Sequence, residues 1–126
     1  MQRANELYAE IEQCTDDTKK LVLLFDLATS LLNFDEKRTQ EVADELGVLA
    51  ERLDSNTGRS YYHSTRGRIF FRKSLFNEAT KEFELASEKA NLTDDVITQA
   101  TCLDSLGIVY RIQGEYDKSL KAGFEA

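Results

Sequence analysis

Apolar residues recur every three or four positions along most of the chain, which is the spacing of one face of an α-helix. The clearest stripe lies between Val42 and Leu53, where charged residues occupy the opposite positions. Proline is absent and glycine is scarce, so few residues interrupt a helix. The pattern predicts an all-α fold with about seven helices.

Polar residues that can cap a helix mark where the predicted helices begin. Asp35 can cap the third helix, and Asp54–Gly58 is a turn-rich break before the fourth. Gly114 is expected to end the sixth helix, because glycine adopts the left-handed conformation that closes a helix without steric cost. The remaining capping candidates are Thr15 or Asp16 for the second helix and Thr93 or Asp94 for the sixth. The predicted limits are Gln2–Gln13 for the first helix, Arg59–Lys73 for the fourth, Asn77–Ala90 for the fifth, about Gln113 for the end of the sixth, and Tyr116–Ala126 for the seventh.

A set of glycines, alanines and aromatic residues in the second half of the chain recurs forty residues later. Each small residue would let two helices approach closely, and each aromatic would fill the space beside it. Helix pairs of this kind cannot bury their apolar faces alone, so they stack. The first copy comprises Gly67, Phe70, Ser74, Phe76, Ala79, Phe83 and Ala86, and the second comprises Gly107, Tyr110, Gly114, Tyr116, Ser119, Gly123 and Ala126.

These residues resemble the tetratricopeptide repeat (TPR) family. Leu106–Leu120, LGIVYRIQGEYDKSL, is similar to the family signature, and Gly67–Ala86 follows it with Arg66 in place of the usual leucine and Ser74 in place of the turn glycine. The last copy departs from the pattern at Gly123, where a large residue is usual. The resemblance implies an α-solenoid of antiparallel helix pairs, a TPR-like superhelix. As one domain of residues 1–126, it would contain an N-terminal helix (1–15), a degenerate repeat (16–54), a repeat (59–92) and a C-terminally truncated repeat (94–126).

The charge of the chain is uneven. Sixteen Lys and Arg against 23 Asp and Glu give a net charge of −7. Arg59–Lys73 carries five cations and no acid, which leaves −12 for the other residues. A net acidic chain is a poor binder of nucleic acid. RNA binding through base stacking on Tyr61, Tyr62 and Phe71 is the weaker interpretation of the basic segment.

The sequence indicates no catalytic chemistry, and we expect no enzyme activity, cofactor or metal. It contains no phosphate-binding glycine loop, and His63 is the only histidine. Cys14 and Cys102 make neither a disulfide framework nor a metal site, although a thiol at a helix end, such as that of Cys14, can be reactive. No apolar run is long enough to cross a membrane, and the N-terminus has no signal-peptide core, so we expect a cytoplasmic location and no membrane insertion.

The resemblance also implies a binding site. In TPR proteins the first helix of each pair lines a concave groove that holds a peptide. An arginine beside an aromatic residue suits a ligand that bears carboxylates, since guanidinium bonds both oxygens. The alternative is that Arg68, Arg72 and Arg111 only offset the protein's own acids. The expected groove residues are Tyr61, Ser64, Arg68, Phe71, Arg72, Asp104, Ile108 and Arg111.

Two functions follow from this resemblance. The first is the regulatory or sensor TPR region of a larger bacterial signalling protein, which binds an acidic peptide or a partner helix. The second is a stand-alone adaptor that self-associates, as a homodimer, through its exposed terminal helices. The sequence does not decide between them, because a fold does not fix a function.

Overall fold

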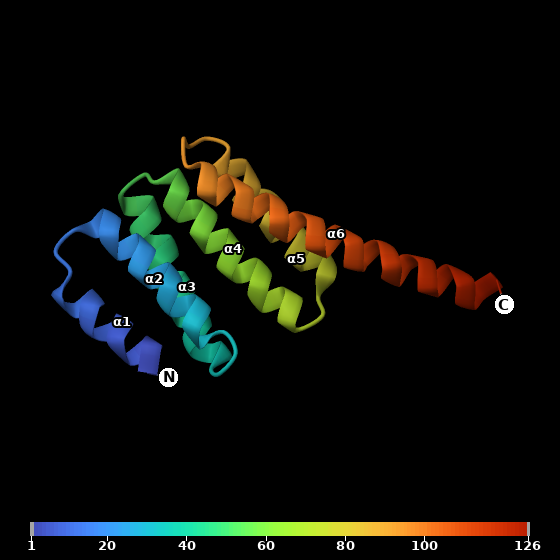
Figure 1. Cartoon of the computed structure of the whole chain (residues 1–126), viewed down its shortest axis with the longest axis horizontal. Helices are drawn as coiled ribbons and strands as arrows, with labels where there is room; N and C mark the ends of the chain where they lie inside the picture. Colours follow the sequence, from blue (N-terminus) through green and yellow to red (C-terminus); the bar gives the residue numbers. More distant parts are fainter. Residues whose placement is uncertain (1, 126) are drawn as a thin grey trace.

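The computed structural model describes residues 2–125 of the chain, with side chains described through Glu115 and at Asp117. Over this range the fold is all-α, as predicted, with six helices rather than seven and no strands. Figure 1 shows their arrangement. The helices are α1 (Gln2–Gln13), α2 (Asp17–Leu31), α3 (Glu36–Arg52), α4 (Asn56–Arg72), α5 (Phe76–Ala90) and α6 (Val96–Glu125).

Each helix packs against the next one along the chain. Helices α2, α4 and α6 also lie side by side, with α3 and α5 behind them and α1 beside α2 (Figure 1). Helix α4 is therefore the centre of the fold, because it alone among the described helices contacts four others, α2, α3, α5 and α6. Within the described residues, no helix is both long and apolar enough to cross a membrane.

The apolar interior is divided between the two halves of the molecule. The larger cluster joins α1, α2 and α3 and is made mostly of leucines, among them Leu7, Leu24 and Leu46. A smaller cluster around Phe83 and Val109 joins α5 and α6. Burying a leucine or phenylalanine side chain stabilises a fold by roughly 1.5–3 kcal/mol, so the leucine-rich half is the more firmly held.

The central helix α4 is buried through small residues rather than through a hydrophobic stripe. A Cβ atom added at Gly58 would lie 2.7 Å from the Cβ of Ala50 in α3, and one added at Gly67 would lie 2.6 Å from Cε1 of Phe83 in α5. The expected role of Gly67, to let the paired helix approach closely, is thus confirmed. Ser60 and Ser64 are buried as well, and their hydroxyls lie 3.3 and 3.8 Å from the Sγ of Cys102 in α6.

Two of the predicted helix caps are confirmed. The Asp16 carboxylate accepts hydrogen bonds from the backbone amides of Thr18 and Lys19, and the Asp35 carboxylate accepts one from the amide of Arg38. Each carboxylate satisfies amides that have no partner inside the helix, and its charge favours the positive end of the helix dipole.

Two other helix starts differ from the prediction. Helix α4 begins at Asn56, because Ser55 caps it through the amide of Gly58, and the turn is confined to the residues around Asp54, which has a positive φ of 49°. Helix α6 is capped by Asp95, whose carboxylate accepts from the Thr98 amide and hydroxyl. Any of the neighbouring Asp, Ser and Thr residues can cap, so the sequence alone did not single out the right ones.

The predicted break at Gly114 is wrong, because α6 continues unbroken from Val96 to Glu125. Glycine permits the left-handed turn but does not impose it, and with no proline the backbone hydrogen bonds of the helix continue. The expected seventh helix is therefore the end of α6, which runs on beyond α4 and α5 (Figure 1). The side chains of Tyr116, Ser119 and Gly123, and the whole of Ala126, lie outside the described residues.

The two glycines that recur forty residues apart predict opposite responses to one methyl group. Gly67→Ala places a Cβ against the Phe83 ring and should lower the free energy of unfolding, with about 1–3 kcal/mol of overpacking outweighing the gain in helix propensity. Gly107→Ala meets no described atom within 4 Å and should raise it by up to about 1 kcal/mol. Urea denaturation of both variants at low protein concentration measures the difference. Equal effects at the two sites would contradict the packing described for α4 and α5.

Candidate functional site

The basic segment of the sequence forms most of α4, and one side of that helix faces α2. The Tyr61 ring stacks on the Phe25 ring of α2 with centroids 4.4 Å apart and planes within 6°. The Arg68 guanidinium lies 5.1 Å from the centroid of the Phe25 ring and donates a 3.0 Å hydrogen bond to the hydroxyl of Thr29. Residues 61 and 68 are seven apart, two turns of helix, so both side chains meet α2 on one face.

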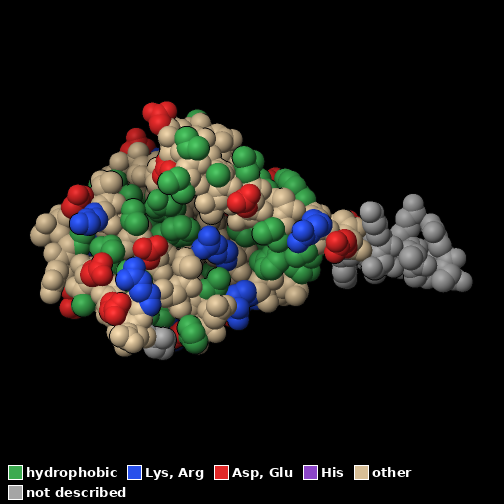
Figure 2. All heavy atoms as spheres, viewed as in Figure 1, with side chains coloured by type: hydrophobic (Ala, Val, Ile, Leu, Met, Phe, Trp, Pro, Cys, Tyr) green, Lys and Arg blue, Asp and Glu red, His purple; other side chains and the backbone are tan. Residues whose placement is uncertain are grey.

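One further turn along, Arg72 donates a 2.6 Å hydrogen bond to the amide oxygen of Asn33, just past the end of α2. The predicted site residues Tyr61, Arg68 and Arg72 are thus brought together as a row along the α2–α4 seam. We call Arg68 and Arg72 the arginine pair. Figure 2 shows the α2–α4–α6 face of the molecule, where Lys and Arg side chains (blue) are set among hydrophobic ones (green).

The other cations of the basic segment have carboxylate partners. The Arg59 guanidinium bonds Glu51 at 2.7 Å and Asp54 at 2.9 Å. Arg66 bonds Glu82 at 3.2 Å, and Lys73 lies 3.2 Å from Glu36. Compensation of the protein's own acids is thus observed for these three cations, whereas the sequence offered it as the alternative for Arg68, Arg72 and Arg111.

The arginine pair differs in its partners. Among the described residues, Arg68 and Arg72 bond a hydroxyl and an amide oxygen and form no ion pair with a carboxylate. Burial lowers the pKa of Arg68, and the nearby Cys102 thiol offsets part of this effect. A partly desolvated cation that has only neutral partners is stabilised by an anion brought to it from outside.

Two of the expected groove residues on α4 serve packing. Ser64 is buried beneath Cys102 of α6, so its hydroxyl is not offered to a ligand. The ring of Phe71 is half-buried and meets the ring of Phe76 edge to face, with centroids 5.5 Å apart. Phe71 therefore belongs mainly to the α4–α5 contact and borders the arginine pair rather than extending it.

The three expected groove residues on α6 are exposed. Cys102 and Val109 are among the residues of α6 that face α4 and α5, and both are buried. Asp104 and Arg111 each follow one of them by two positions, which is about 200° around a helix, so they point away from α4 and α5. Ile108 lies between these two directions and is 45% exposed. Asp104 and Arg111 therefore lie apart from the arginine pair.

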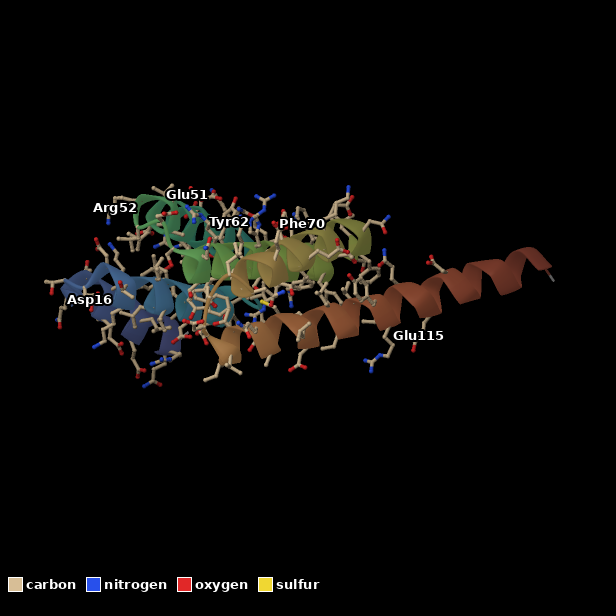
Figure 3. All side chains as sticks on the ribbon, turned by 90° about the horizontal axis from the view of Figure 1, so that it is seen from above. Asp16, Glu51, Arg52, Tyr62, Phe70 and Glu115 are labelled. Atoms are coloured by element: carbon tan, nitrogen blue, oxygen red, sulfur yellow. The ribbon has the colours of Figure 1, made fainter. Side chains whose placement is uncertain are left out.

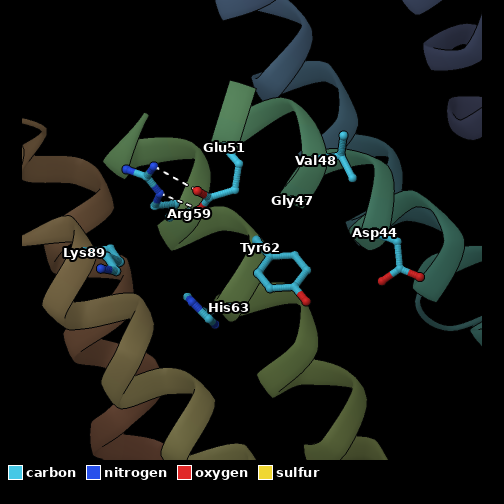
Figure 4. A pocket seen from close by; sticks show the side chains of 8 residues that line it. All are labelled: Asp44, Gly47, Val48, Glu51, Arg59, Tyr62, His63 and Lys89. Carbon is cyan, nitrogen blue, oxygen red and sulfur yellow. Dashed lines mark hydrogen bonds and ion pairs between the residues drawn. The ribbon is translucent and has the colours of Figure 1, made fainter. Parts of the chain in front are cut away.

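The sequence analysis did not anticipate a pocket on the α3–α5 side of the molecule. Figure 3 shows Glu51 and Tyr62 on this side, opposite to α6. A pocket of about 830 Å³ lies there, with Gly47 leaving room for the Tyr62 ring on its floor (Figure 4). Two of its charged lining residues, Glu51 and Arg59, pair with each other, and His63 bonds Glu82, which lies beside the pocket. The lining residues are Asp44, Gly47, Val48, Glu51, Arg59, Tyr62, His63 and Lys89.

The Glu82 carboxylate lies next to this pocket and has two partners on α4. It accepts a 2.8 Å hydrogen bond from Nδ1 of His63 and a 3.2 Å bond from Arg66, which join α4 to α5. Burial raises the pKa of Glu82, but the hydrogen bond from His63 and the charge of Arg66 outweigh burial and leave the pKa lowered. His63 is thus a structural partner of Glu82 in the α4–α5 interface.

The remaining candidates for chemistry are dispersed. Within the part of the chain that the structure describes, no three His, Cys, Asp or Glu side chains are grouped so as to hold a metal ion. Cys102 is buried, and the Cys14 thiol, at the end of α1, lies 3.2 Å from the backbone oxygen of Asp16. Comparison with known proteins identifies no relative: no family model matches the chain, and neither a curated protein nor a solved structure matches it significantly.

The Glu82 contacts predict a pH-dependent loss of stability. Glu82→Gln should lower the free energy of unfolding at pH 7 by about 1–3 kcal/mol, because His63 and Arg66 lose a charged partner. Since the pKa of Glu82 is lower in the folded state, its charge stabilises the fold above the pKa of an unfolded glutamate. This contribution is lost as the pH falls through the folded pKa.

The difference in unfolding free energy between wild type and Glu82→Gln should therefore shrink below about pH 4. Denaturant titrations between pH 7 and pH 3 measure it. The exposed residue Glu88, on the same helix, provides the control substitution Glu88→Gln, which should have little effect at any pH. A Glu82→Gln deficit that stays constant across this range would contradict the assignment.

Proposed function

We propose that the chain is a TPR-like interaction module that binds an acidic peptide, or an acidic helix of a partner protein, through the α2–α4–α6 face. The proposal rests on one observation: the arginine pair has only neutral partners among the described residues. A carboxylate of the ligand would supply the charge that Arg68 and Arg72 lack.

The arrangement of the helices supports this assignment. Consecutive helices pack in sequence, and α2, α4 and α6 share one side of the molecule, as the first helices of stacked repeats would. The close contact of Gly67 with Phe83 is the contact expected between the two helices of one repeat. The α-solenoid is proposed on these grounds together with the resemblance in Gly67–Ala86, the copy that folds as a pair of helices, α4 and α5.

The chemistry of the face suits a ligand with both charge and apolar surface. A guanidinium presents a planar set of donors that matches a carboxylate, and it stays charged at any physiological pH. The stacked rings of Phe25 and Tyr61 border the arginine pair on one side, and the exposed side chain of Ile108 offers apolar surface on α6. We therefore expect acidic residues alternating with apolar ones in the ligand rather than a uniformly acidic segment.

The same proposal carries a cellular role, which rests on the resemblance alone. In a larger bacterial signalling protein, a module of this kind would act as the sensor, and occupation of the face would be the signal. The module itself would bind and not catalyse, so the purified chain should show no nucleotide hydrolysis.

Neutralising the arginine pair tests the binding face. The probe is a fluorescein-labelled peptide of alternating Glu and Leu, with a Gln-and-Leu peptide as its neutral counterpart. Arg68→Gln with Arg72→Gln should weaken binding of the acidic peptide at least about tenfold, because two charge-assisted hydrogen bonds are lost. Arg68→Lys with Arg72→Lys keeps the charge and should lie between the two. Fluorescence anisotropy measures each affinity.

A matched control removes the same charge elsewhere. Lys37 and Lys81 are exposed, lie on α3 and α5, and have no ion-pair partner among the described residues. Lys37→Gln with Lys81→Gln should leave the affinity within about twofold of wild type. Equal weakening in both double variants would indicate attraction by net charge alone. No binding of the acidic peptide to wild type up to about 1 mM would also overturn the proposal.

A further inference from the structure

The outward face of α6 carries apolar side chains that no described residue covers. Leu103 is 60% exposed and Ile97 is 80% exposed, and both lie in a well-formed helix. Gly107 lies next to Leu103 on this face, with no described atom within 4 Å of where its Cβ would be. The glycine forty residues earlier, Gly67, is covered by the ring of Phe83. Helix α6 thus offers the same kind of close-contact surface as α4, without the helix that packs on it.

Two opposite charges flank Gly107 on this face. Asp104 lies one turn before the glycine and Arg111 one turn after it, and both side chains are exposed. Within the described residues neither side chain forms a hydrogen bond or an ion pair, whereas most arginines of α3 and α4 do. The two charges are seven residues apart, about 10 Å along the helix axis.

We propose that this face binds a second copy of the chain, with the two α6 helices packed antiparallel across a two-fold axis between residues 107 and 108. In that register Asp104 faces Arg111 of the partner subunit, and Arg111 faces Asp104 of the partner subunit. Gly107 meets Ile108 of the partner subunit, so the absent Cβ provides the space for the isoleucine. Leu103 and Ile97 flank the contact and are covered on both copies.

The charge pattern selects the second copy and its direction. A two-fold interface requires a surface that complements itself, so that residue i meets residue j and residue j meets residue i. The sequence around Gly107 meets this requirement with one acid and one base on opposite sides of the axis. A parallel pairing in register would place Asp104 against its own copy and Arg111 against its own copy, and this repulsion excludes it.

The position of α6 leaves room for this contact. Helix α6 lies at the edge of the helical array, with α4 and α5 on its inner side (Figure 1). The arginine pair on the α2–α4 seam does not take part. The interface shares Ile108 with the apolar border of the proposed peptide site but does not include Arg68 or Arg72, so dimer formation and peptide binding are tested by different substitutions.

Charge reversal tests the register. Sedimentation velocity of the wild-type chain should show dimer forming at concentrations below about 1 mM. Asp104→Arg places two arginines opposite each other at both ends of the contact, and Arg111→Asp does the same with two aspartates. Each single variant should be monomeric over the range in which the wild type is dimeric, with the dissociation constant raised at least about tenfold.

Mixing the two single variants is the decisive test of the antiparallel register. Asp104→Arg and Arg111→Asp are complementary to each other in the antiparallel register, so an equimolar mixture should form a heterodimer. The doubly reversed chain, Asp104→Arg with Arg111→Asp, should form a homodimer again. Unchanged far-ultraviolet circular dichroism of every variant separates loss of the contact from loss of the fold.

A second oppositely charged pair provides the control. Lys81 and Glu88 of α5 are also seven residues apart and exposed, but the acidic Glu84 lies between them instead of a glycine. Lys81→Asp with Glu88→Arg should leave dimer formation unchanged. A wild-type chain that stays monomeric to about 1 mM, or a mixture of the single variants that does not associate, would overturn the proposal.

Discussion

The close approach of four helices to α4 is the constraint on which the rest of the structure depends. A helix surrounded on so many sides has no room for a stripe of leucines, and the buried positions of α4 are accordingly Gly, Ser and Thr, with a single Ile69. Gly58 lies against Ala50 of α3, and Gly67 lies against Phe83 of α5. Glycine in a helix interior costs about 0.5–1 kcal/mol relative to alanine, and here the packing of Ala50 and Phe83 offsets that cost.

The same crowding determines where the charges of α4 lie. Small residues occupy its contact surfaces, so its long cationic side chains leave the helix only along the seams between neighbours. At the seams with α3 and α5 they meet acids, since Arg59 reaches Glu51 and Arg66 reaches Glu82. At the seam with α2 they meet Thr29 and Asn33, which are neutral. The cations of this basic segment thus form two groups. Arg59 and Arg66 pair with carboxylates, whereas the arginine pair has no carboxylate partner among the described residues.

These features differ in how far the sequence predicted them. The all-α fold, the helix starts at Asp16 and Asp35, and the close contact at Gly67 follow from local periodicity, capping chemistry and side-chain size, and the structure bears them out. The division of the arginines was not predictable, because Glu51 and Glu82 come from other helices and no local rule pairs them with α4. The helix break predicted at Gly114 is wrong because glycine permits the left-handed conformation that ends a helix but does not impose it.

Gly67 and Gly107 show how one residue type takes its meaning from its surroundings. Both lie in helix interiors at equivalent positions of a forty-residue recurrence, and both carry the same intrinsic cost. At Gly67 the Phe83 ring fills the space that the missing side chain leaves, and the cost is offset within the chain. At Gly107 the described residues leave that space open, while Leu103 and Ile97 remain in water beside it. On this face Gly107 lowers the helix propensity, and the apolar side chains beside it are exposed to water. Both costs are offset when another surface packs closely against the face. In the proposed dimer, the opposed charges of Asp104 and Arg111 make the same face of a second copy that surface.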